Sequence, residues 1–181
     1  MQLVKQNIIM FIASISARLC WDEKPSGAAF ARATCVGALI AALLLLLSWL
    51  LFAMLGAAHI GGLAGAPVFE RGSIAIFFAA VIWAPLFETL IGQTIPIAGL
   101  IRFGAPHSIA IVTSAMLFSA GHMALGGGLA QGMITLVGGL CFASVFAANM
   151  RGSFARAFGL TATAHASSNA LVLLLSFGLG F

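Results

Sequence analysis

Charged side chains are scarce in this sequence, and tyrosine is missing altogether. Of its 181 residues only 7% are charged, whereas 62% are hydrophobic. A soluble domain carries roughly 25% charged residues, so the composition predicts an all-α integral membrane protein. The eight basic residues are dispersed at the ends of apolar segments, which favours membrane topology over a phosphate-binding patch. We therefore expect membrane lipid, and no nucleic acid, as a partner.

The sequence also lacks the usual cysteine motifs. Its three cysteines, Cys20, Cys35 and Cys141, are scattered, and no two of them have CxxC spacing. An odd, dispersed set supports neither a disulfide framework nor a cysteine-based zinc site. We interpret all three as small apolar packing residues.

The N-terminal segment has a character of its own. Apolar side chains recur at helical spacing between Met1 and Trp21, while Lys5 and Arg18 fall elsewhere on the helical wheel. A secretory signal is the rival interpretation, but Arg18 follows the short apolar run closely, so we expect the segment to be retained. We predict an interfacial amphipathic helix and a following loop over residues 1–27.

Five apolar segments follow, and crossing a bilayer takes about 20 residues, with a range of roughly 17 to 25. The predicted spans are Thr34–Ala58, Ile74–Leu100, Ser108–Leu125, Leu129–Met150 and Phe158–Leu179. We expect them to form a single helical membrane domain over residues 28–181. Pro85 and Pro96 should distort the second span, because proline removes a backbone hydrogen bond and clashes with the preceding turn.

The basic residues predict the orientation of these spans. With a cytoplasmic N-terminus, only Arg71 of the eight lies outside. The cytoplasmic set is Lys5, Arg18, Lys24, Arg32, Arg102, Arg151 and Arg156. Five spans place the C-terminus outside, and the compact Ala- and Gly-rich segments favour a bacterial inner membrane.

Glu88 is the most unusual residue of the chain. It lies inside the second span, in the run Trp83–Gln93, with no Lys or Arg nearby in sequence. A charged side chain at the bilayer centre costs from about 2.5 to well above 10 kcal/mol, so Glu88 needs a partner, a proton or a task. The structural alternative is a protonated Glu that bonds a backbone carbonyl or a histidine.

Two later spans carry polar side chains at a comparable depth. His122 lies in the third span, and His165 and Asn169 lie one helical turn apart on the fifth. At about 1.5 Å per residue, these groups and Glu88 fall about 10 to 21 Å below the cytoplasmic boundary. We therefore expect all four to meet inside the membrane. Taken singly, a membrane His or Asn is more often a hydrogen-bond partner between helices.

These four residues offer the groups that peptide hydrolysis needs. A carboxylate and an imidazole around a water deprotonate it for attack on an amide carbonyl. A second imidazole and an Asn amide donate hydrogen bonds to the oxyanion that develops on the carbonyl oxygen. Zinc bound by one Glu and two His is the alternative. Because no HExxH pair occurs, we expect a metal-free water and no cofactor.

The order of these residues resembles the CPBP family of intramembrane peptidases, the CAAX protease and bacteriocin-processing or ABI family. The motifs of that family are EExxxR, FxxxH and HxxxN or a close variant, each on its own hydrophobic helix. Here they stand as Glu88–Gln93, Phe118–His122 and His165–Asn169. The resemblance covers about residues 74–181 and implies a glutamate-dependent endopeptidase.

The resemblance also implies a role for each motif residue. Glu88 and His122 would activate the attacking water, while His165 and Asn169 would stabilise the oxyanion. The expected substrate is a peptide or a membrane protein, and no prenyl-binding groove can be read from the sequence.

The first motif departs from the family pattern at two positions. Thr89 replaces the second Glu and Gln93 replaces the Arg. The family's pair is spaced for an intrahelical salt bridge, and here both ends are neutral, so no buried charge is left unpaired. These changes motivate an alternative: a weakened or inactive protein of the same fold that acts as an immunity protein, a chaperone or a subunit with a partner membrane protein.

A proton relay is the third interpretation, since Glu and His chains carry protons through membranes. The absence of an inverted repeat argues against a transporter.

Overall fold

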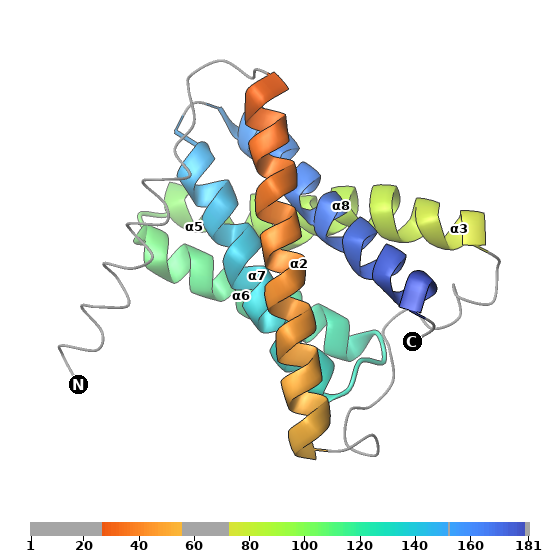
Figure 1. The fold of residues 1–181 in the computed structure, drawn as a ribbon. Coiled ribbons are helices and arrows are strands. Elements are labelled where there is room, and N and C mark those ends of the chain that lie inside the picture. The colour runs from red at the N-terminus through yellow and green to blue at the C-terminus, as the bar shows by residue number, and fades with distance from the viewer. Residues whose placement is uncertain (1–26, 56–72, 152, 180–181) are drawn as a thin grey trace.

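The computed structural model of the chain describes residues 27–55, 73–151 and 153–179, which Figure 1 draws as ribbon. No strand occurs in these ranges. The helices are α2 (Gly27–Leu55), α3 (Ser73–Phe77), η3 (Phe78–Trp83), α4 (Ala84–Glu88), η4 (Thr89–Thr94), α5 (Ile95–Arg102), α6 (His107–Ala124), α7 (Leu129–Asn149) and α8 (Phe154–Leu179), where η3 and η4 are π-helical. The predicted all-α fold is confirmed. The predicted interfacial helix lies outside the described residues.

Within the described ranges, four helices are long and apolar enough to cross a membrane. They are Gly27–Leu55, Ile74–Arg102, Leu129–Asn149 and Phe154–Ser176. Large apolar side chains such as Leu39, Trp49 and Leu174 are exposed on the outside, as expected of a surface that faces lipid. The chain is therefore a membrane protein.

The third predicted span is a helix, α6, but it is not one of these four. It has 18 residues, and its sequence includes polar side chains such as Ser114, Ser119 and His122. The predicted number of five spans therefore stays a prediction.

Helix α8 begins at Phe154 and not at Phe158 as the sequence predicted. The backbone N–H of Arg156 donates a hydrogen bond to Oγ of Ser153 at 3.0 Å. Such a serine cap satisfies a donor in the first turn of a helix, so part of the segment between the fourth and fifth predicted spans is helical. Helix α2 likewise begins before its predicted span.

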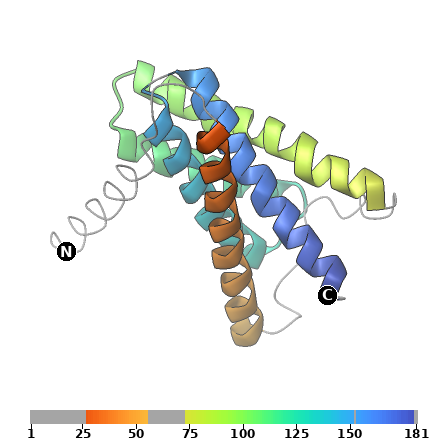
Figure 2. The same cartoon turned by 45° about the horizontal axis from the view of Figure 1, so that its top comes forward.

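Helix α8 lies between α2 and the long second span that runs from α3 to α5, as Figures 1 and 2 show. It contacts α2, α7, η3, α4 and η4. Helices α6 and α7 pack against each other, and α6 also contacts η4 and α5. The middle of the second span is thus enclosed by α6 and α8, the two helices that carry the predicted histidines.

Two glycines in the left-handed region follow the ends of α5 and α6. Gly104 has a φ of 81° and Gly126 a φ of 97°. After α6, the N–H of Gly127 donates to the carbonyl of His122, and the N–H of Gly126 donates to that of Met123. This Schellman pairing fixes the end of α6 that carries His122.

Small residues bring α2 and α8 into close contact. Ala33 and Ala164 are fully buried at this contact, and a Cβ on Gly37 would lie 2.1 Å from the carbonyl oxygen of Ala164. In lipid, association of helices depends on such close packing, because the hydrophobic effect does not drive it.

Replacing Gly37 by Ala should therefore separate α2 from α8. The added methyl group overlaps a backbone carbonyl, which cannot rotate away, so we expect a loss of about 1–3 kcal/mol, as in other overpacked cores. Gly99→Ala is the matched control, because, apart from its chain neighbours and the backbone of its own helix, no described atom lies within 4 Å of a Cβ there. Thermal unfolding in detergent compares the two variants, and equal melting temperatures would contradict the close approach.

Candidate active site

Glu88 ends α4, the short α-helical segment between the π-helical turns η3 and η4. After each π turn, the N–H of the next residue donates to a carbonyl five residues back. The residue that follows is Pro85 in one case and Pro96 in the other, and neither has an N–H to donate. The distortion predicted at the two prolines thus takes the form of a wider turn before each of them. Such π-bulges are frequent at functional sites.

The Glu88 carboxylate faces two imidazoles. Its Oε2 lies 3.7 Å from Nε2 of His122 and 3.5 Å from Nε2 of His165. The side chain of Glu88 is 31% exposed, that of His122 is 18% exposed and that of His165 is 4% exposed. The cluster is therefore open on the side of Glu88 and closed behind His165. The structure brings these three predicted residues together, while their catalytic roles stay a prediction.

Backbone contact fixes the tautomer of His122. Its Nδ1 lies 3.0 Å from the carbonyl oxygen of Phe118, one turn back on α6. A carbonyl oxygen only accepts, so Nδ1 bears a hydrogen and donates. In the neutral ring, Nε2 is then an acceptor that faces Glu88. Nε2 of His122 and Oε2 of Glu88 are then two acceptors 3.7 Å apart. This arrangement needs a shared proton, or a water that donates to both atoms.

Aromatic rings hold His165. The ring of Phe142 stacks on its imidazole with centroids 4.3 Å apart, and Phe118 meets it edge-on at 5.8 Å. Its Nδ1 has no hydrogen-bond partner among the described residues, so packing orients the ring. Nothing in the sequence marks Phe142 as part of a site, because α7 has no acidic residue, basic residue or histidine.

Phe118 reaches both histidines because Gly92 of η4 leaves room for it. Its ring centroid is 4.5 Å from that of His122, and a Cβ on Gly92 would lie 2.9 Å from the Phe118 ring. The Phe of the FxxxH motif thus packs between the two imidazoles and the span that carries Glu88.

Asn169 has a different partner from the one expected. Its Nδ2 donates a hydrogen bond of 2.8 Å to the backbone carbonyl of Ala80 in η3. No hydrogen bond from Asn169 to Glu88, His122 or His165 is found among the described residues. One of its two N–H groups is therefore engaged with the backbone, and the predicted meeting of four side chains is found for three.

Thr89 and Gln93 lie in the interior of the bundle. Both are fully buried. Oγ1 of Thr89 and both polar atoms of the Gln93 side chain have no hydrogen-bond partner within the described part of the chain. The two positions at which the first motif departs from the family pattern are thus neutral, enclosed and within five residues of Glu88 in sequence.

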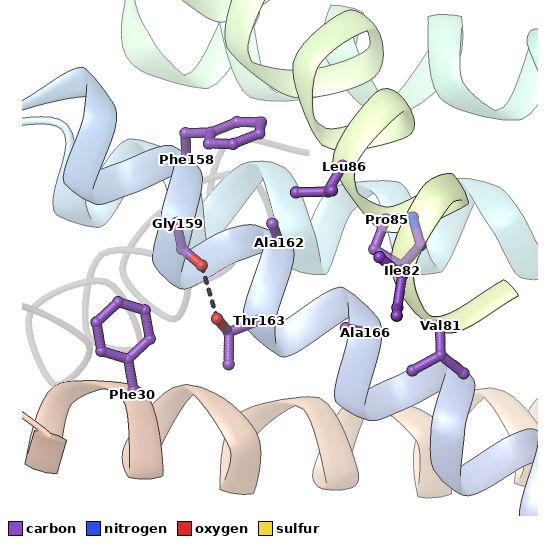
Figure 3. Close-up of a pocket in the computed structure, with 10 residues that line it drawn as sticks. All are labelled: Phe30, Val81, Ile82, Pro85, Leu86, Phe158, Gly159, Ala162, Thr163 and Ala166. Carbon is purple, nitrogen blue, oxygen red and sulfur yellow. Dashed lines mark hydrogen bonds between the residues drawn. The ribbon is translucent and has the colours of Figure 1, made fainter. Parts of the chain in front are cut away.

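An apolar groove of about 300 Å³ lies between α2, α4 and α8, as Figure 3 shows. Phe30 of α2, Leu86 of α4 and Ala166 of α8 are among the residues that line it. The Thr163 hydroxyl in its wall donates to the Gly159 carbonyl of the same helix at 2.8 Å. None of the residues that line the groove is charged, and Glu88, His122 and His165 are not among them.

In the part of the chain that the structure describes, no group of three or more His, Cys, Asp or Glu side chains is arranged to hold a metal ion. Comparison with protein-family models, with curated proteins and with solved structures gave no match. Sequence motifs and local geometry are therefore the basis for assigning a function.

Proposed function

We propose that this protein is an intramembrane endopeptidase of the CPBP type, which hydrolyses a peptide bond with a water activated by Glu88 and His122. One observation carries the proposal: Oε2 of Glu88 lies within 3.7 Å of Nε2 of both His122 and His165. The three residues come from three helices, and the carboxylate is partly exposed. A hydrolytic site needs this combination of a base, imidazoles and access.

The two acceptors hold and activate the water. One hydrogen of the water points to the Glu88 carboxylate and the other to Nε2 of His122, whose Nδ1–H is held by the Phe118 carbonyl. The water oxygen attacks the carbonyl carbon as Glu88 takes a proton, which gives a tetrahedral oxyanion. Glu88 then passes this proton to the leaving amide nitrogen, the C–N bond breaks, and a carboxyl and an amine result.

Oxyanion stabilisation is the role of α8, the helix that carries His165 and Asn169. With a hydrogen on Nε2, His165 donates toward the same space, and its buried Nδ1 is then an acceptor without a partner among the described residues. The family resemblance assigns Asn169 to the same oxyanion. The expected substrate is a peptide or a membrane protein that reaches the exposed side of Glu88.

The membrane arrangement follows the positive-inside rule. We place the protein in a bacterial inner membrane, with the N-terminus on the cytoplasmic side. The N-terminal segment then lies on the membrane surface, and α6 is a fifth span. Arg102, Arg151 and Arg156 then lie on the cytoplasmic side.

A non-catalytic role within the same fold is the second candidate. Thr89 and Gln93 support it, because they are neutral and fully buried at the positions of the family's charged pair. In this case the protein binds a membrane partner as an immunity protein, chaperone or subunit, and cleaves nothing.

Hydrolysis in ¹⁸O-labelled water tests the proposal without a known substrate. Each cleaved bond takes one oxygen from water into its new carboxyl group. Membranes that contain the wild-type protein should yield new C-termini with one ¹⁸O by mass spectrometry. Membranes with His122→Asn should yield at least tenfold fewer, because acid–base groups contribute about 10²–10⁴-fold.

Equal labelling of the same C-termini in both membranes would contradict the proposal. So would an absence of labelled C-termini in the wild type. If, in addition, His122→Asn loses a membrane protein that copurifies with the wild type, the non-catalytic role is favoured.

A further inference from the structure

The backbone carbonyl of Ala80 has lost its helical donors. The residue four positions on is Ala84, whose N–H donates to Ala79 and not to Ala80. The residue five positions on is Pro85, which has no N–H. A carbonyl without a donor is costly in a membrane interior, where water is not at hand. The Asn169 side chain of α8 supplies the donor at 2.8 Å.

A second carbonyl in the same span lacks its α-helical donor. Gly92 lies four positions before Pro96, so its carbonyl lacks the α-helical donor. The Ser114 hydroxyl of α6 donates to it, and Ser114 is fully buried. A polar side chain of a neighbouring helix thus takes the place of each proline's missing N–H.

These two hydrogen bonds lie on either side of Glu88, at Ala80 before it and at Gly92 after it. Their donors belong to α8 and α6, the helices that carry His165 and His122. Each bond therefore ties the backbone around the carboxylate to the helix of one imidazole.

We propose that Asn169 and Ser114 are positioning residues: they bond two backbone carbonyls that each lose a helical donor to Pro85 or Pro96, and so set the place of Glu88 between its imidazoles. The inference rests on the proposed hydrolysis for its effect on rate, but the hydrogen bonds can be tested without it. It differs from the family resemblance, in which Asn169 donates to the oxyanion.

A double-mutant cycle separates the two roles of Asn169. Asn169→Leu removes its donor at similar size, and Pro85→Ala supplies an N–H five residues after Ala80. If Asn169 acts through the Ala80 carbonyl, Asn169→Leu does less harm in the Pro85→Ala background. If it donates to the oxyanion, its loss costs the same in both backgrounds.

The cycle is read out by stability and by rate. Asn169→Leu should lower the melting temperature in detergent by about 2–4 °C, the shift typical of one lost interaction in a chain of this size, and Pro85→Ala should recover at least half of it. With a peptide substrate taken from the labelled cleavage sites, kcat should fall about 10²-fold, as for a displacement of about 1 Å, while KM stays within about twofold. Ser114→Ala should act in the same direction, and Ser114→Thr should retain the wild-type rate.

Asn149→Leu is the matched control. The Asn149 amide donates to the Val145 carbonyl of its own helix at 2.8 Å, so its loss should cost the same with Pro85 or with Ala at that position. The chain has three asparagines, Asn7, Asn149 and Asn169. Selective ¹⁵N labelling therefore resolves the Asn169 side-chain amide, which should exchange its hydrogen at least tenfold more slowly than that of free asparagine.

Rapid exchange of the Asn169 amide, together with equal effects of Asn169→Leu in both backgrounds, would overturn the inference. If the stability cycle and the amide exchange agree with the inference but no variant affects cleavage, the two hydrogen bonds exist and their role in positioning a catalytic Glu88 is wrong. If no cleavage occurs at all, it is the proposed function that fails, while the two hydrogen bonds are still measured.

Discussion

Glu88→Gln should abolish hydrolysis and leave the protein at least as stable as the wild type. Gln has the size of Glu but cannot take a proton from water, and general-base catalysis contributes about 10²–10⁴-fold. The same change removes a carboxylate that no Lys or Arg pairs with in the described part of the chain. Unpaired charges are costly in membranes, so catalysis and stability should move in opposite directions.

The labelled-water assay and the melting temperature in detergent measure the two effects on one preparation. Glu88→Asp is the control, because it keeps a carboxylate but draws it back by one methylene group. We expect Glu88→Asp to lose about 10²-fold in rate through misplacement and to stay above Glu88→Gln. A Gln variant with the wild-type rate would remove Glu88 from the mechanism, and one that loses rate only because it unfolds would make Glu88 a structural residue.

Composition and spacing were sufficient to predict the helical membrane fold and the meeting of Glu88 with His122 and His165. Hydropathy marks segments that must be helical because lipid offers no partner for the backbone. Depth along each helix is set by a constant rise per residue, so polar groups at similar depths on neighbouring helices come within reach of one another.

The finer features could not be predicted in the same way. A π turn shifts the register of a helix by one residue, and the sequence around Pro85 indicated a distortion without its form. The bond between Asn169 and Ala80 depends on that shift and joins residues 89 positions apart. Phe142 stacks on His165, yet its sequence context is that of any packing residue.

The buried pair Thr89 and Gln93 should respond very differently to single and double replacement. Thr89→Glu alone puts a carboxyl group at a fully buried position without a cation, and Gln93→Arg alone does the reverse. An unpaired buried charge costs about 3–5 kcal/mol, so each single variant should be strongly destabilised or fail to accumulate. The double variant pairs the two charges four residues apart and should regain most of this loss.

Chemical unfolding of membrane preparations measures the stability of the wild type, the two single variants and the double variant. A coupling energy near zero would mean that the two side chains do not face the same space. Recovery should be incomplete, because Glu and Arg are larger than the residues they replace, and overpacking costs about 1–3 kcal/mol. Thr89→Val with Gln93→Met is the control. It removes the polar atoms that lack partners within the described ranges at similar volume, so it should raise stability. A loss of stability in this control would show that the buried polar atoms are hydrogen-bonded in the membrane.

The double variant Thr89→Glu with Gln93→Arg decides between the two candidate functions. A restored Glu–Arg pair places a cation near the carboxylate that, on the proposed mechanism, takes the proton from water. If the wild-type protein is a peptidase weakened by its neutral pair, Thr89→Glu with Gln93→Arg should raise the yield of ¹⁸O-labelled C-termini above the wild type, and adding Glu88→Gln should remove the gain. If the folded double variant cleaves nothing, the neutral pair is not what limits hydrolysis. A membrane partner that binds the wild type and the double variant equally well would then favour the non-catalytic role.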